Sequence, residues 1–133
     1  MSTRHDWIRW FDEIGIEDIP LVGGKNASLG EMYRELAPRG VRVPNGFAIT
    51  ARAYHDFLRQ TGVDARIREI LADLDTQDLV GLRQRGRRVR HAILGATLPT
   101  HLQEAIAAAY AQLGQGHPEP VDVAVRRDRK SVV

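Results

Sequence analysis

Cysteine is absent from the chain, and its absence excludes several classes of chemistry. Without thiols the protein has no disulfide framework, no thiolate metal site and no thiol nucleophile. No apolar run is long enough to span a bilayer, and the residues after Met1 lack the apolar stretch of a signal peptide. We therefore expect a cytoplasmic protein without a membrane partner.

Histidine spacing offers no catalytic or metal site either. No histidine belongs to a metal-binding pattern such as H-E-x-x-H, and no Ser/His/Asp arrangement is supported. The histidines are His5, His55, His91, His101 and His117. The sequence therefore gives no catalytic residue and no metal ligand.

Neither positive nor negative charge predominates in the chain. The chain has 19 basic and 17 acidic residues, a net charge of +2, which is too small to imply a nucleic-acid partner. Hydrophobic residues make up 43% and charged residues 27%, which is ordinary for a soluble globular protein with one modest domain. The sequence makes no prediction about the oligomeric state.

Hydrophobic periodicity predicts an α+β protein that is mostly helical with a few short strands. We predict strands at 7–11, 47–49 and 121–125, and helices from the glycine pair at 23–24 to about 38–40, from Thr50 to about 62, at 67–74, at 79–93 and after Pro99 to about 113. Thr50 is the expected N-cap of its helix, and Pro99 is expected in a helical first turn capped by Thr97. Residues 13–20 are expected to be a connection.

Gly23-Gly24-Lys25 is the best candidate for chemistry. Glycines let backbone N–H groups approach a phosphate closely, a helix N-terminus favours an anion, and lysine adds a mobile positive charge. The motif lacks the G-x-x-x-x-G-K-[ST] spacing of a Walker A loop. The alternative from these residues alone is a glycine turn before a helix with a solvated lysine.

Arg126 ends the predicted strand at 121–125. An arginine at a strand end can hold a phosphate through its planar fork of donors. The alternative is an ordinary surface arginine.

Five arginines crowd one predicted helix, at positions 83, 85, 87, 88 and 90. One interpretation is a small basic helical interaction module that binds RNA or an acidic partner. The alternative is a solvated helix face, because the arginines fan around the helix and few aromatic residues lie between them.

Four ordered segments together resemble the phosphoenolpyruvate synthase (pyruvate, water dikinase) family. They are VGGKNASLGEM at 22–32, GVRVPNGFAIT at 40–50, AYAQL at 109–113 and VAVR at 123–126, and the resemblance covers residues 5–126. Pyruvate phosphate dikinase and rifampicin phosphotransferase share this domain type, so a fragment of such a dikinase is an alternative. The Asn-Ala-Ser after Gly-Gly-Lys favours the synthase.

The resemblance implies an incomplete ATP-grasp N-terminal subdomain. It implies that Lys25 and Arg126, with Gly23 and Gly24, contact the phosphates of ATP. The complete enzymes convert ATP, pyruvate and water to phosphoenolpyruvate, AMP and phosphate. Their Mg²⁺ ligands, phosphorylated histidine and pyruvate-binding barrel lie outside this segment. The resemblance therefore implies nucleotide contacts but no catalytic competence alone.

The final residues depart from the family pattern. We expect a partial ATP-binding domain at 1–126 and a tail at 127–133 that does not belong to the family, because the family continues after Arg126 with Ser-Ser-Ala. The last residues, Asp128 to Val133, read Asp-Arg-Lys-Ser-Val-Val. The codons GAT CGG AAG AGC GTC GTG would encode this peptide, and they match a common sequencing adapter. Our hypothesis is that this tail is translated adapter sequence.

Overall fold

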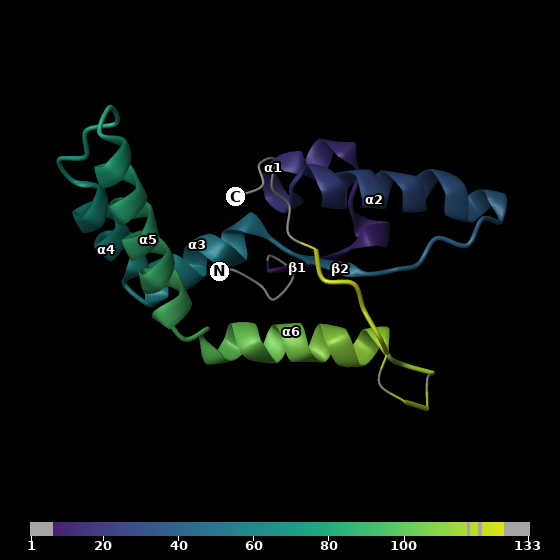
Figure 1. The fold of residues 1–133 in the computed structure, drawn as a ribbon. Coiled ribbons are helices and arrows are strands. Elements are labelled where there is room, and N and C mark those ends of the chain that lie inside the picture. The colour runs from purple at the N-terminus through teal and green to yellow at the C-terminus, as the bar shows by residue number, and fades with distance from the viewer. Residues whose placement is uncertain (1–6, 117, 120, 127–133) are drawn as a thin grey trace. The chain divides into compact units, whose positions relative to one another are not determined.

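The computed structural model describes residues 7–116, 118, 119 and 121–126. This part of the chain is mostly helical and contains one two-stranded sheet, which confirms the predicted α+β class (Figure 1). The strands and helices are β1 (Ile8–Trp10), α1 (Ile19–Val22), α2 (Gly24–Leu36), β2 (Phe47–Ile49), α3 (Ala51–Gln60), α4 (Val63–Leu71), α5 (Leu79–Gly95) and α6 (Thr100–Leu113). Single 3₁₀ turns cover Phe11–Glu13, Ile16–Asp18 and Ala37–Arg39.

The chain divides into two compact units. Unit 1 comprises Met1–Ala53 together with His101–Val133, and unit 2 comprises Tyr54–Thr100. Unit 1 holds the sheet, α1, α2 and nearly all of α6. Unit 2 holds α4, α5 and most of α3.

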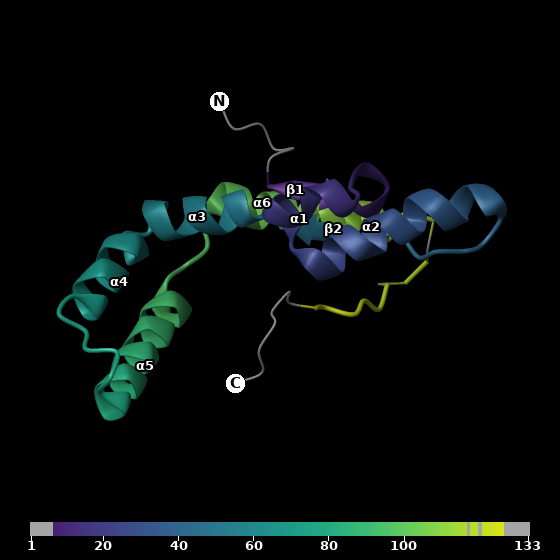
Figure 2. The same ribbon diagram turned by 90° about the horizontal axis from the view of Figure 1, so that it is seen from above.

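The sheet of unit 1 is a short antiparallel pair. Ile8 lies opposite Ile49, and Trp10 lies opposite Phe47 with ring centroids 5.4 Å apart. Such cross-strand aromatic pairs stabilise a ribbon too short to persist by itself. Figure 1 shows the β1–β2 ribbon between α2 and α6, and in the view from above in Figure 2 these elements overlap. The strands predicted at 7–11 and 47–49 are thus confirmed.

The centre of unit 1 is a small apolar cluster. Its buried residues are Ile14, Val22, Ala27 and Ala48, with Phe11 and Leu21 packed against them. Gly30 lies in the middle of α2, where glycine is normally unfavourable. A Cβ added there would lie 2.5 Å from the carbonyl oxygen of Ile14, so the close approach of the helix to this loop requires a glycine.

Unit 2 is built around the packing of α4 against α5. Phe57, Val63 and Ile70 are its buried apolar residues, whereas α5 has no buried residue over its whole length. Asp78 caps α5, because its carboxylate accepts a hydrogen bond of 3.1 Å from the Gly81 N–H. The helical period predicted for 79–93 is confirmed.

Three expectations from the sequence need correction. Residues 121–126 belong to no helix or strand, because no neighbouring strand among the described residues pairs with them. The helix α6 begins at Thr100, so Pro99 precedes it rather than lying in its first turn. The segment predicted as a plain connection, 13–20, contains a 3₁₀ turn and the start of α1.

Two other expectations have definite outcomes. The Thr50 hydroxyl accepts a hydrogen bond of 3.2 Å from the Ala53 N–H, which confirms its capping role. Among the residues that the structure describes, each helix is too short or too polar to cross a membrane.

Candidate functional site

The Gly-Gly-Lys motif lies where one helix ends and the next begins. The helix α1 ends at Val22, and α2 starts two residues later at Gly24. The residue between them, Gly23, has φ 85° and ψ 164°, a backbone conformation that is essentially restricted to glycine. This glycine therefore permits the sharp change of direction that exposes the N-terminus of α2.

Three hydrogen bonds hold this turn. The Gly23 N–H donates to the Ile19 carbonyl at 2.8 Å, and the Ala27 N–H donates to the Gly23 carbonyl at 3.0 Å. The side-chain amide of Asn26 donates to the Val22 carbonyl at 2.9 Å. Asn26 thus ties the first turn of α2 back to the end of α1, a role that its place in the sequence does not predict.

The first N–H groups of α2 remain available to a ligand. A helix supplies no internal acceptor for its first N–H groups, which here belong to Gly24, Lys25 and Asn26. A Cβ added at Gly24 would meet no atom within 4 Å, so open space lies in front of this backbone. The partial positive charge of the helix N-terminus adds to the attraction for an anion.

Lys25 adds a full positive charge at the same place. Its side chain is exposed, and no described residue forms a hydrogen bond or an ion pair with its amine. Ala27, two residues later, is fully buried and fixes the helix against the unit 1 cluster. The motif therefore combines a fixed backbone with a mobile cation.

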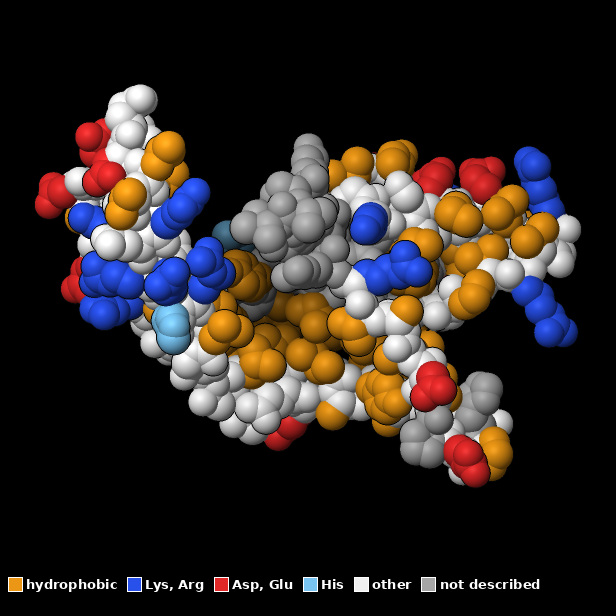
Figure 3. All heavy atoms as spheres, viewed as in Figure 1, with side chains coloured by type: hydrophobic (Ala, Val, Ile, Leu, Met, Phe, Trp, Pro, Cys, Tyr) orange, Lys and Arg blue, Asp and Glu red, His pale blue; other side chains and the backbone are white. Residues whose placement is uncertain are grey.

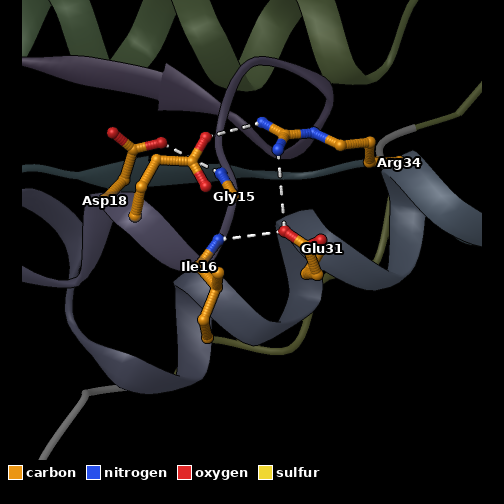
Figure 4. A network of polar contacts seen from close by, with 6 residues as sticks. Gly15, Ile16, Asp18, Glu31 and Arg34 are labelled. Atoms are coloured by element: carbon orange, nitrogen blue, oxygen red, sulfur yellow. Dashed lines mark hydrogen bonds and ion pairs between the residues drawn. The ribbon is translucent and has the colours of Figure 1, made fainter.

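A polar network anchors the middle of α2 to the loop before α1 (Figure 4). The guanidinium of Arg34 lies 3.0 Å from the carboxylate of Glu17 and 3.7 Å from that of Glu31. Glu31 also accepts a hydrogen bond of 3.0 Å from the Ile16 N–H. The network joins two segments that flank the glycine turn and so helps to orient it.

This network shifts the ionisation of its two end members. A hydrogen bond from its own backbone N–H and another from Arg34 lower the pKa of Glu17 below its ordinary value. Glu17 in turn raises the pKa of Arg34. The only sequence signal for the network was the i,i+3 spacing of Glu31 and Arg34 on one helix.

Arg126 occupies a different setting from the one predicted. It is exposed and lies outside any strand, in a segment that is tethered by a 2.6 Å hydrogen bond from the Tyr110 hydroxyl to the Val121 carbonyl. Within the described part of the chain, no hydrogen bond or ion pair joins Arg126 to Gly23, Gly24 or Lys25. The structure thus brings together the glycine turn and Lys25, but it does not link Arg126 to them.

The arginine run on α5 divides into two kinds of side chain. Arg85 donates to the carbonyl oxygen of Ile70 and, at 2.7 Å, to that of Ala72, so it satisfies the C-terminal end of α4. The arginines at 83, 87, 88 and 90 form no recorded hydrogen bond or ion pair with the described residues. One member of the run is therefore structural, which the sequence did not reveal.

No metal cluster accompanies the glycine turn and Lys25 among the described residues. Among residues 7–116, 118, 119 and 121–126, no group of three or more His, Asp or Glu side chains could hold a metal ion.

Comparison with known proteins assigns the chain to a family. Residues 19–128 match the family of the pyruvate phosphate dikinase AMP/ATP-binding domain. Phosphoenolpyruvate synthase from Aquifex aeolicus (strain VF5) is 50% identical over 90% of this chain and 14% of its own length. The phosphoenolpyruvate synthase of Synechocystis sp. is 45% identical over 90% of this chain and 15% of its own length.

The same relationship extends to other bacteria. Phosphoenolpyruvate synthase from Escherichia coli (strain K12) is 46% identical over 80% of this chain and 13% of its own length. The chain thus spans about one seventh of the length of these curated relatives. The family match covers most of the chain, and the chain belongs to the pyruvate phosphate dikinase AMP/ATP-binding domain family.

Proposed function

We propose that this chain supplies part of the ATP-phosphate-binding surface of a phosphoenolpyruvate synthase. The observation that carries the proposal is the positive-φ turn at Gly23, which presents free N–H groups and the exposed Lys25 at the start of α2. The turn occurs in a chain of an AMP/ATP-binding family whose relatives are named phosphoenolpyruvate synthases. The RNA-binding or acidic-partner module is not favoured as the main function.

The chemistry of this surface is electrostatic. Phosphoryl transfer depends on neutralising the charge of the phosphate oxygens and on positioning them, since the reaction needs little covalent help from the protein. The backbone at Gly24 and Lys25 can hold one phosphate, and the Lys25 amine can reach an outer oxygen. Arg126 is proposed to bind the same triphosphate once the rest of a nucleotide-binding domain surrounds both residues.

The remaining parts of the proposal concern a longer parent enzyme. In that enzyme the chain would form part of an ATP-grasp lobe, in a cytoplasmic protein that uses ATP, pyruvate and water. Mg²⁺ would neutralise the charge of the phosphates, but the described residues offer no cluster to hold it. The chain alone is proposed to bind nucleotide weakly and to lack catalytic competence.

Calorimetric titration of the purified 133-residue chain tests the phosphate contact. ATP and inorganic tripolyphosphate should bind weakly, and Lys25→Gln should weaken both about tenfold, because it removes a charge-assisted hydrogen bond. AMP binding should change less, since AMP lacks the outer phosphates. Arg39→Gln is the matched control, because Arg39 is an exposed cation in the 3₁₀ turn that follows α2.

Two results would overturn the phosphate contact. One is the absence of ATP binding by the wild-type chain. The other is an equal loss of affinity for Lys25→Gln and Arg39→Gln, which would show that general charge accounts for the binding. Circular dichroism of each variant should match the wild-type spectrum, so that a loss of affinity cannot come from unfolding.

A double-mutant cycle tests the role of Arg126. If Lys25 and Arg126 hold one triphosphate as a coupled pair in the longer parent enzyme, the ATP-binding losses for Lys25→Gln and Arg126→Gln should not add. Additive losses would mean that the two side chains bind the triphosphate independently, and an ATP affinity unchanged by Arg126→Gln in that enzyme would contradict the contact.

A further inference from the structure

One side of α5 is exposed from end to end. At 100° per residue, the side chains on this side cover about half of the helix circumference, whereas Arg85, Val89 and Ala92 lie on the opposite side. We call this surface the outer face of α5, and every member is exposed: Leu79, Val80, Arg83, Arg87, Arg88, Arg90, His91 and Leu94. Because α5 has no buried residue, α4 and α3 leave this face uncovered.

The charge of the outer face has a single sign. The helix contains no Asp or Glu at all. Within the described chain, the arginines of the outer face have no acidic partner, and Asp78 at the start of α5 is engaged in capping. On the adjacent α4, Arg66 is paired with Glu69 at 3.5 Å, and Arg68 with Asp64 at 3.8 Å. The positive charge of α5 is therefore not balanced within unit 2.

A shallow groove runs along one edge of the outer face. It has a volume of about 360 Å³ and is lined by Arg66 of α4 and by Arg87, Arg88, His91 and Ala92 of α5. Figure 3 shows Lys and Arg side chains gathered over this pair of helices. Guanidinium groups from two helices that converge on one groove are suited to carboxylate or phosphate oxygens.

Large apolar side chains frame the basic residues. Leu94 is 84% exposed, and at the other end of the helix Leu79 is 67% and Val80 66% exposed. Leu94 lies one turn beyond His91, so the apolar and basic side chains belong to one continuous surface. Exposed apolar groups combined with arginine are typical of protein interfaces.

We propose that the outer face of α5 and its groove bind an acidic protein segment that carries Asp or Glu side chains beside Leu- or Ile-like groups. The arginines would pair with the carboxylates, and Leu79 and Leu94 would pack against the apolar groups. RNA fits less well, because α4 and α5 contain no Phe, Tyr or Trp side chain on which a base could stack. The inference is independent of the nucleotide site in unit 1.

Fluorescence anisotropy with defined probes tests this docking surface on the whole chain. The first probe is a labelled peptide that contains only Glu and Leu, patterned as an amphipathic helix. The others are poly-L-glutamate, poly(U) RNA and phosphatidylglycerol vesicles. The Glu/Leu peptide should bind best, and its affinity should fall as salt rises because exposed charges are screened.

Variants locate the binding on α5. The double change Arg87→Gln with Arg88→Gln should weaken peptide binding at least tenfold, and Leu94→Ser should weaken it severalfold. Arg87→Lys with Arg88→Lys should retain part of the affinity, because the charge remains. The matched control is Arg39→Gln with Arg42→Gln, which removes two exposed arginines of unit 1 and should leave the affinity within twofold.

Several outcomes would overturn the proposal. Tighter binding of poly(U) would point to nucleic acid, and tighter binding of the vesicles would point to a membrane surface. An equal loss of peptide affinity in the unit 1 control would show that only net charge matters. An unchanged peptide affinity for Leu94→Ser would show that Leu94 makes no apolar contact with the peptide. Circular dichroism should confirm that each variant keeps its helix content.

Discussion

The guanidinium of Arg85 on α5 donates a hydrogen bond of 2.7 Å to the carbonyl oxygen of Ala72, the residue that follows α4. The same nitrogen also donates to the Ile70 carbonyl. The last carbonyl groups of a helix have no internal donor, and a cation near them also complements the helix dipole. Arg85 on α5 therefore caps the C-terminal end of α4.

Replacing Arg85 by alanine should destabilise unit 2. The loss of hydrogen bonds from a charged donor should lower the free energy of unfolding by about 1.5 to 3 kcal/mol. Urea denaturation followed by circular dichroism measures this change. Arg88→Ala is the control, because its exposed side chain has no partner among the described residues, and it should change stability by less than about 0.5 kcal/mol. Equal effects of the two substitutions would contradict the capping role.

Two glycines of α2 should respond in opposite ways to alanine. Gly30→Ala should destabilise unit 1 by about 1 to 3 kcal/mol, because the new Cβ would lie 2.5 Å from the carbonyl oxygen of Ile14. Gly24→Ala has open space and should be neutral or stabilising by up to about 1 kcal/mol. Thermal and urea unfolding compare the two variants. A harmless Gly30→Ala would mean that the loop and helix are not packed as described.

Thr50 should contribute to stability through its hydroxyl. The side chain is buried and caps α3, so Thr50→Ala should cost about 1 kcal/mol. Thr50→Ser keeps the hydroxyl and should recover most of that loss. Denaturant midpoints of the two variants provide the comparison. Equal stability of the Ala and Ser variants would show that the hydroxyl of residue 50 does not stabilise α3 as a cap.

Acid should weaken the contact between Glu17 and Arg34. The pKa of Glu17 is lower in the folded protein than its ordinary value of 4.5, so the unfolded chain takes up the proton more readily. The stabilisation is therefore fully present above about pH 4.5 and is lost as the pH falls through the lowered pKa.

Urea midpoints between pH 6 and pH 3 measure this dependence. The wild-type chain should lose more stability on acidification than Glu17→Gln, by a small margin because both side chains are exposed. Glu35→Gln on the same helix, whose carboxylate has no recorded ion pair within the described residues, should behave like the wild type. An identical pH profile for Glu17→Gln and the wild type would contradict the contact.

The residues after Arg126 should prove foreign to the natural gene. Residues 127–133 lie outside the described part of the chain, so the test is the source DNA. Sequencing across codon 126 in the source genome should show Ser-Ser-Ala codons in place of the adapter-like sequence. A native gene that ends at Val133 would refute the hypothesis.

Local sequence patterns predicted the helices of this fold better than the pairing of its strands. The strand at 47–49 was predicted with its observed bounds, because a turn signal precedes it and the N-cap Thr50 follows it. The segment at 121–125 has an equally good alternation of side chains but forms no strand, since a strand also needs a neighbour to accept its hydrogen bonds. Periodicity indicates a tendency, whereas pairing depends on residues far away in the chain.

The candidate site was predictable to the same limited extent. The glycine pair and Lys25 could be placed before a helix from their spacing alone. The contacts of Arg34 with Glu17 and of Arg85 with the end of α4 join residues that are 13 to 17 positions apart. No local pattern specifies which distant partner an arginine will meet, so these roles became visible only in the structure.

The division of the chain has a consequence for the order of folding. Unit 2 is one continuous stretch inserted into unit 1, so its helices can pair as soon as they leave the ribosome. The central cluster of unit 1 lies within residues 11–48, but unit 1 is complete only when α6 has docked, which requires closure of a loop that spans the whole insertion. Replacing residues 54–100 by a short flexible linker should therefore accelerate the assembly of unit 1.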